Sequence, residues 1–244
     1  MAVAPQGLTA IASIPVGQYV TTKVAGMTVD LDTVWASAVA GLVVIGLGLA
    51  VRRSATAHEV PGRLQLLWEG IVGAVQNQVE QTVGPRSGPM VPLAITLFVF
   101  ILVANWLEIL PSGAVTVALP SPTADANTCY AMAIFVFLVY NVAGLRHKGL
   151  LGFLRRFVRP YKVLLPINII EEISKPVTLS LRLFGNMFSG GLMIALLAVL
   201  FPFEISWIPT VGWKLFDMFI GLIQAFIFAL LAIIYYQMAI SEEH

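Results

Sequence analysis

The chain has 244 residues, of which 58% are hydrophobic and 11% charged, and its mean hydropathy is +0.88. Soluble domains are roughly 45–50% apolar and about 25% charged, so this composition excludes an ordinary soluble fold and predicts a membrane protein. The formal net charge of +1 gives no electrostatic reason to expect nucleic acid as a partner.

The N-terminal third is expected to hold an external segment, a first span and a surface helix. Residues 1–33 form the external segment. A spanning helix needs ~20 mostly apolar residues, and residues 34–51 meet this need before Arg52 and Arg53. Residues 60–83 carry apolar side chains at helical spacing, which predicts an amphipathic helix at the membrane surface. A soluble linker helix is the alternative for this last segment.

The middle of the chain contains two further apolar runs that are long enough to cross a bilayer. Residues 90–110 form the second predicted span, which ends at Pro111. Residues 128–145 form the third, which ends at the basic residues Arg146 and Lys148.

The fourth apolar run, residues 163–200, is too long for an upright span. Its 38 residues would form a helix ~57 Å long, whereas the hydrocarbon core is ~30 Å thick. It is therefore one strongly tilted helix or two half-helices broken near Pro176. With residues 212–240 it is expected to form a long, strongly tilted hairpin. The predicted fold class is an all-α integral membrane protein. Residues 34–244 form its single domain, with about five membrane-embedded helices plus one interfacial amphipathic helix.

Basic residues in short loops predict the orientation, because such loops lie in the cytoplasm. They surround the surface helix and follow the third span: Arg52, Arg53, Arg63, Arg86, Arg146, Lys148, Arg155, Arg156, Arg159 and Lys162. The other side holds the acids Asp30, Asp32, Asp125, Glu204 and Glu108. We therefore expect a multi-pass protein of the inner (plasma) membrane with its N-terminus outside and its C-terminus in the cytoplasm.

The fourth run carries a polar stripe along one helical face. At about 100° per residue, six polar residues fall within about 40° of Arg182, and Glu172 lies just beside them: Asn168, Glu171, Lys175, Thr178, Asn186 and Ser189. A mid-membrane arginine costs between about 2.5 and 17 kcal/mol, depending on the scale, so Arg182 is a functional candidate. Its guanidinium cannot carry protons but can hold a carboxylate. A structural salt bridge is the alternative, for which the last helix offers only Asp217.

The last predicted helix has a sparser polar stripe. Four residues lie within about 40° of Asp217 on the same helical wheel: Gly221, Gln224, Phe228 and Tyr235. Glycines on the last two helices would let their backbones approach closely, and packing alone is an equal explanation for them. Gln224 is either a functional group or an interhelical hydrogen-bond partner.

Several segments resemble signatures of one family, subunit a of the F-type ATP synthase in its bacterial form. Ser174–Gly190, which reads SKPVTLSLRLFGNMFSG, closely resembles the longest of these signatures. Gln224–Phe228, Asn105–Pro111 and Pro122–Asn127 resemble three others. The resemblance covers roughly residues 91–244, and the N-terminal third matches only in layout.

The resemblance implies a proton-translocating stator subunit that is not an enzyme by itself. Its partners would be the c-subunit ring, b-type peripheral stalk subunits, the F1 head through the complex, and membrane lipid. The family's essential arginine maps onto Arg182, and its polar partners map onto Asn186 and Gln224. The outer half-channel would contain Asn186, Ser189, Asp217, Gln224, Asp125 and Glu108. The cytoplasmic half-channel would contain Asn168, Glu171, Glu172 and Lys175.

One position departs from the family pattern. Many members pair an acid or a histidine at the position of Gly191 with the position of Asp217, and glycine leaves Asp217 without that partner. A secondary transporter or ion channel subunit is the alternative function, but a transporter predicts internal repeats, and the sequence shows none. No cofactor or metal is expected, because there is no nucleotide-binding glycine loop and the three histidines are isolated.

Overall fold

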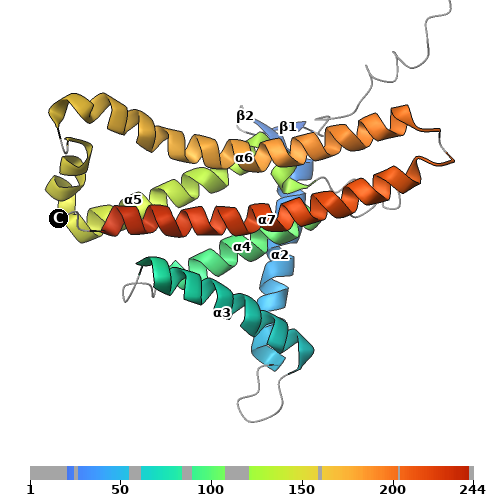
Figure 1. The fold of residues 1–244 in the computed structure, drawn as a ribbon, viewed down its shortest axis with the longest axis horizontal. Helices are drawn as coiled ribbons and strands as arrows, with labels where there is room; N and C mark the ends of the chain where they lie inside the picture. Colours follow the sequence, from blue (N-terminus) through green and yellow to red (C-terminus); the bar gives the residue numbers. More distant parts are fainter. Residues whose placement is uncertain are drawn as a thin grey trace, which may run out of the picture.

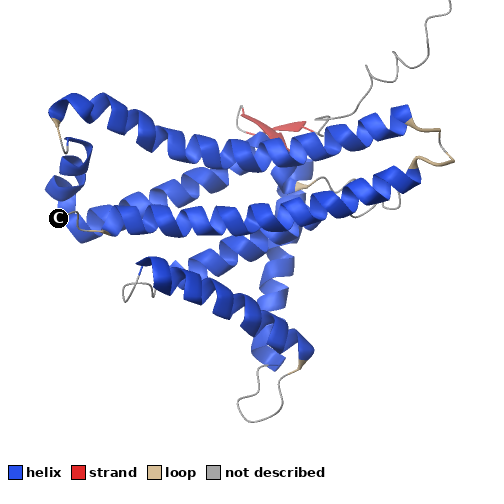
Figure 2. Ribbon diagram, viewed as in Figure 1, coloured by secondary structure: helices blue, strands red, loops and turns tan. Residues whose placement is uncertain are grey.

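The computed structural model describes residues 21–24, 27–54, 62–83, 90–107, 121–158, 161–202 and 204–241. Within these ranges the chain forms six α-helices and one β-hairpin (Figure 1, Figure 2). Four helices are long and apolar enough to cross a bilayer, and one further apolar helix is shorter. The chain is an integral membrane protein, so the predicted all-α membrane fold class is confirmed. The helices are α2 (Leu31–Ser54), α3 (Arg63–Val83), α4 (Met90–Trp106), α5 (Ala126–Val158), α6 (Leu165–Leu200) and α7 (Trp207–Ile240).

The hairpin ahead of α2 was not expected from the sequence. Strand β1 (Thr21–Val24) pairs with antiparallel strand β2 (Met27–Asp30), within the segment predicted only to be external. Threonine and valine favour strands because their branched side chains suit a pleated surface. Helix α2 follows at once, with Asp32 in its first turn and two arginines in its last, as the helix dipole favours.

Helix α7 lies at the centre of the bundle and contacts α3, α4, α5 and α6 (Figure 1). Its buried face is made mostly of small and aromatic residues: Gly221, Gln224, Ala225, Phe228, Ala229, Ala232, Ile233, Tyr236 and Ala239. Small residues let neighbouring helices pack closely in a membrane, where dispersion contacts replace the hydrophobic effect. A methyl group on Gly144 of α5, for example, would lie 3.1 Å from the carbonyl oxygen of Ala239.

Helix α5 is longer than the predicted third span, residues 128–145. It continues past the basic residues to Val158 and changes direction at Gly149, whose φ of 69° is left-handed. Glycine has no Cβ and takes this conformation without strain. The final part of α5 and the 3-10 turn η4 (Lys162–Leu164) then lead the chain into α6.

Helix α6 is continuous over its 36 residues, although Pro176 lies inside it. The alternative of two half-helices broken near Pro176 is therefore wrong. At 1.5 Å per residue α6 is ~54 Å long, far more than a ~30 Å hydrocarbon core. It runs beside antiparallel α7, and α2 crosses this hairpin steeply in the view of Figure 1. Helix α7 begins at Trp207, earlier than the predicted residue 212.

Candidate functional site

The polar stripe of α6 lies along an edge that the described residues leave partly open. Arg182 is exposed, as are Glu171, Thr178 and Ser189, and the other members are half-buried. An adjacent face of the helix packs inward, with Leu179, Leu183 and Met187 among its buried residues. The polar residues of this helix therefore face outward. A helix whose exposed surface contacts only lipid would instead carry apolar residues there.

Arg182 takes no part in an ion pair with any described residue. On α6 the ion pair joins Lys175 Nζ to Glu172 Oε2 at 2.9 Å. Asp217, the acid considered as a structural partner for Arg182, instead lies against Gly190. Gly190 is eight residues from Arg182, or roughly 12 Å along the helix. The structure thus leaves the guanidinium available to a group outside the described chain.

The carboxylate of Asp217 is in close contact with the backbone of α6. A Cβ atom on Gly190 would lie 2.8 Å from Asp217 Oδ1 and 3.0 Å from Oδ2. Trp213, one turn earlier on α7, donates from Nε1 to the carbonyl oxygen of Gly190 at 3.2 Å. Lys214 lies within electrostatic range of Asp217. The family resemblance predicted position 191 as the neighbour of Asp217, whereas in the structure Gly190 lies against its carboxylate.

Two buried amides lie between Arg182 and this contact. Asn186 Nδ2 and Gln224 Nε2 are buried, and neither has a hydrogen-bond partner among the described residues. Asn186 is one turn from Arg182 on α6, and Gln224 lies on the buried face of α7. A buried donor without a partner costs about 1–3 kcal/mol, so both groups are suited to bind water or an incoming carboxylate.

A hydrogen-bonded network ties α4 to α7 beside these amides. Asn105 Nδ2 donates to the carbonyl oxygen of Gly221 at 3.0 Å, and Thr123 Oγ1 donates to Asn105 Oδ1 at 2.8 Å. Ser121 Oγ reaches Thr123 Oγ1 at 2.7 Å and the carbonyl oxygen of Ala104 at 2.9 Å. Asn105 and Thr123 belong to segments that carry the family resemblance, but the sequence predicted no role for either residue.

A second cluster lies at the other end of α6. Glu172 is 7% exposed and pairs with Lys175, whose Nζ lies 5.7 Å from the ring centre of Tyr235 on α7. The Tyr235 ring is in turn 5.8 Å from that of Tyr140 on α5. Two predicted residues, Glu172 and Lys175, are thus brought together with two tyrosines. Tyr235 belongs to the stripe predicted on the last helix, whereas no sequence signal pointed to Tyr140.

The remaining predicted site residues lie apart from this cluster. Asn168 Nδ2 donates to the carbonyl oxygen of Phe157 at 2.9 Å and so ties the start of α6 to the end of α5. Glu171 is exposed. Ser189 Oγ donates to the carbonyl oxygen of Asn186 within its own helix.

Asp125 is buried at the start of α5 and acts as its N-cap. Its Oδ1 accepts from the backbone N–H of Asn127 at 3.1 Å, and its Oδ2 accepts from Thr128 Oγ1 at 3.2 Å. Such caps satisfy backbone donors that have no partner in the helix. Glu108, the other acid predicted near the outer side, lies outside the described residues.

Fold and site together define an α-helical membrane protein with a fixed cation on the open edge of a long helix and polar groups on either side of it. The sequence model of the family described as ATP synthase A chain matches residues 34–237. The chain is similar to ATP synthase subunit a of Mycobacterium tuberculosis (strain CDC 1551 / Oshkosh), with 48% identity over 243 residues, 96% of this chain and 97% of the relative. It is also similar to ATP synthase subunit a of Acidothermus cellulolyticus (strain ATCC 43068 / DSM 8971 / 11B), with 45% identity over 252 residues, 100% of this chain and 92% of the relative.

The chain therefore belongs to the ATP synthase subunit a family, as the resemblance predicted. Members of this family are proton-translocating subunits of the membrane sector, Fo, and work inside a multi-subunit complex. The family assignment rests on nearly the full chain, so it includes the N-terminal third that the resemblance matched only in layout.

Proposed function

We propose that Arg182 is the fixed cation of the proton path and faces the carboxylates of a rotating c-subunit ring. The observation that carries this proposal is the exposed guanidinium on a long apolar helix, without an ion pair to any described residue. A mid-membrane arginine is too costly to be kept without a role or a partner. A ring carboxylate that arrives without its proton supplies that partner.

Arg182 separates two aqueous half-channels in this proposal. A carboxylate that carries its proton is neutral and can move through the lipid, whereas a deprotonated carboxylate is held near the guanidinium. Protons then cross only when the ring turns, because no water path passes the arginine. Each proton charge that crosses 100 mV contributes about 2.3 kcal/mol to rotation.

The outer half-channel runs from Asp217 towards Arg182. Asp217 exchanges protons with water that enters beside Gly190, and the two buried amides, Asn186 and Gln224, supply donors for water or the ring carboxylate. Ser189 on the exposed edge and Glu108 complete the path towards the outside. Asp125, whose carboxylate caps α5, belongs to the same outer half-channel.

The cytoplasmic half-channel uses the cluster at the other end of α6. Glu172 and Lys175 form its buried charged pair, and Tyr235 closes one side of it. Asn168 and the exposed Glu171 lie nearer to the start of the helix and form the entrance. Ionisable residues within membrane helices pair with one another and mark ion pathways, which supports a place for this pair in the proton path.

The tilt of the α6–α7 hairpin follows from the same arrangement. Helix α2 has the length and composition of an ordinary span, and the hairpin crosses it steeply (Figure 1). If α2 stands near the membrane normal, α6 lies far from it and can follow the curved side of a ring. The N-terminus lies outside and the C-terminus lies in the cytoplasm of a cell with this protein in its inner membrane. The partners are the c-ring, b-type stalk subunits and, through the complex, the F1 head, which performs the ATP chemistry.

The test replaces Arg182 in the assembled complex. Arg182→Ala should abolish ATP synthesis driven by a proton gradient and ATP-driven proton pumping, and assembly should persist. Arg182→Lys should fail or nearly fail, because an ammonium does not reproduce the forked, delocalised cation. Arg52→Ala, an exposed arginine in the last turn of α2, is the matched control and should leave both activities near normal. Normal pumping by an assembled Arg182→Ala complex would contradict the proposal.

A secondary transporter is the weaker candidate. Transporters place their substrates at paired broken helices, whereas α6 and α7 are continuous over their described lengths.

A further inference from the structure

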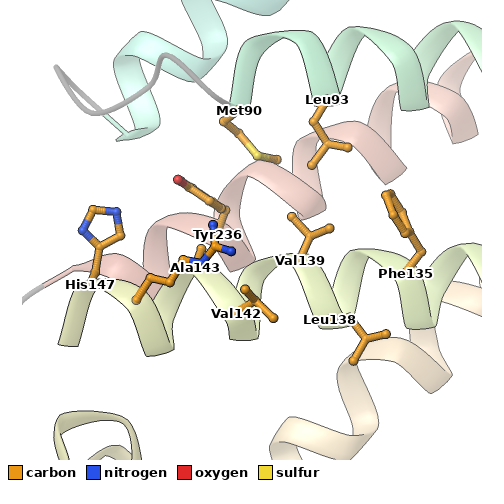
Figure 3. Close-up of a pocket in the computed structure, with 10 residues that line it drawn as sticks. Met90, Leu93, Phe135, Leu138, Val139, Val142, Ala143, His147 and Tyr236 are labelled. Carbon is orange, nitrogen blue, oxygen red and sulfur yellow. The ribbon is translucent and has the colours of Figure 1, made fainter. Parts of the chain in front are cut away.

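An open groove lies between α4, α5 and α7, and no residue of α6 lines it (Figure 3). Its volume is about 550 Å³, within the ~300–1,000 Å³ range of small-molecule sites. Met90 and Leu93 of α4 form one wall, α5 forms the other, and Tyr236 of α7 lies between them. The proposed proton path does not use this space.

The wall supplied by α5 is apolar over several turns. Phe135, Leu138 and Val142 follow one another along the helix, and each is about half exposed. Figure 3 shows Phe135 and Val139 of α5 pointing toward Leu93 and Met90 of α4. In a bilayer an apolar surface of this kind contacts hydrocarbon chains.

One end of the groove is basic. Arg146 and His147 line it at the last turns before Gly149, and none of the lining residues is an acid. Arg146 is exposed and has no ion pair with another described residue. A guanidinium forms forked, charge-assisted hydrogen bonds with phosphate oxygens, and imidazole can add a further donor.

The length of the groove identifies the occupant. From Phe135 to His147 the α5 wall spans twelve residues, or roughly 18 Å, and one leaflet of a ~30 Å hydrocarbon core is ~15 Å deep. A spanning helix of a partner subunit would need a surface through both leaflets. An apolar groove one leaflet deep, with two basic residues at the end where a headgroup would lie, fits a phospholipid.

We propose that this groove binds one anionic phospholipid, with its phosphate on Arg146 and His147 and an acyl chain along Leu138 and Phe135. The lipid belongs to the leaflet at the Arg146 end, which is cytoplasmic in the orientation proposed above. Basic pockets between membrane helices on this side bind anionic headgroups. The acyl chain of the lipid completes the packing around Tyr236 of α7, the helix that also carries Asp217.

The test measures lipid binding by the purified full-length chain with native mass spectrometry. Phosphatidylglycerol and phosphatidylcholine are added in separate titrations. Arg146→Gln with His147→Gln should weaken phosphatidylglycerol binding by about fivefold or more. It should weaken phosphatidylcholine binding less, because the choline group offsets the charge of the phosphate. Arg52→Gln with Arg53→Gln, a basic pair at the end of α2 outside the groove, is the matched control and should retain wild-type binding.

A second variant tests the apolar part of the groove without changing a basic residue. Val142→Trp fills the groove and should lower the binding of both lipids to a similar extent, whereas Arg146→Gln with His147→Gln should lower phosphatidylglycerol binding more than phosphatidylcholine binding. Equal loss of phosphatidylglycerol in the groove pair and in the control pair would overturn the proposal. So would a stoichiometric cross-link from Leu138→Cys to another subunit in the assembled complex, because a protein helix would then occupy the groove.

Discussion

Gly190 determines where the Asp217 carboxylate can lie. No Cβ atom fits between the α6 backbone and the carboxylate oxygens, the nearer of which is 2.8 Å from the position that atom would take. The indole of Trp213 is hydrogen-bonded to the same glycine, so the carboxylate lies against a backbone surface of α6. The outer path proposed above would therefore depend on one titratable carboxylate and on its placement by packing.

Gly190→Ala and Asp217→Asn should both slow proton flux without preventing assembly. The first displaces the carboxylate and the second removes its titration, and a displacement of about 1 Å at a reacting group can cost tenfold or more in rate. Flux is measured as proton-driven ATP synthesis in membrane vesicles. Gly212→Ala is the matched control, because no atom lies within 4 Å of the added Cβ. Unchanged flux in Asp217→Asn would reduce Asp217 to a structural role.

Thr123 holds Asn105, which in turn donates to the backbone of Gly221. Thr123→Ala should lower the free energy of unfolding by about 1 kcal/mol, because it leaves the buried amide oxygen of Asn105 without its donor. Chemical denaturation of the purified chain in detergent measures the change. Thr96→Ala is the control, since Thr96 is exposed and bonds only to the Pro92 carbonyl of its own helix. Equal effects of the two variants would mean that the α4–α7 network contributes no stability.

At the level of elements, Gly149 sets the direction in which the chain enters α6. The short final part of α5 beyond this glycine carries Phe157, whose carbonyl oxygen holds Asn168 at the start of α6. A straight α5 would carry this contact away from the cluster of Glu172 and Lys175. The kink therefore positions the long helix that bears Arg182.

Gly149→Ala should destabilise the protein by about 1 kcal/mol or more, because an L-residue is strained at a φ of 69°. It should also lower proton-driven ATP synthesis by shifting the start of α6. Gly46→Ala, in the middle of α2 with no atom near the added Cβ, should be neutral or slightly stabilising. Thermal denaturation and ATP synthesis of both variants provide the comparison. A neutral Gly149→Ala would show that α5 can bend there without a left-handed residue.

At the scale of the whole molecule, the orientation remains a prediction from basic loops. The ends of α2 and α5 carry basic residues, and the α6–α7 turn carries Glu204. These positions should lie on opposite sides of the membrane. Because α6 and α7 run antiparallel, the orientation also decides which half-channel faces outward.

Single cysteines at exposed positions test this arrangement. Arg53→Cys and Leu150→Cys should react with a membrane-impermeant maleimide only from the cytoplasmic side, and Glu204→Cys only from outside. The native Cys129 is fully buried, so its background labelling should be low. Ser121 is a poor reporter for the outer side because it is also buried. The opposite pattern would exchange the two half-channels.

The sequence alone determined the class of the protein and its family, and it predicted Arg182 as the central cation. These features depend on local properties: runs of apolar residues, a helical period, and one arginine that lipid would not tolerate. The continuity of α6 was left open, because a proline inside a helix can kink it or break it. The β-hairpin and the Gly149 kink were missed, since both are small departures inside segments with another dominant pattern.

Only the tertiary structure decided which side chains meet. Gly190 faces Asp217, Lys175 lies over Tyr235, and Asn105 holds the backbone of Gly221. Each contact joins residues on different helices, and it depends on how far each helix is rotated and shifted against the next. A helical wheel fixes angles within one helix but contains no such information. Rotation and shift follow from close packing of small residues such as Gly144 and Ala239, and therefore emerge only when the helices assemble.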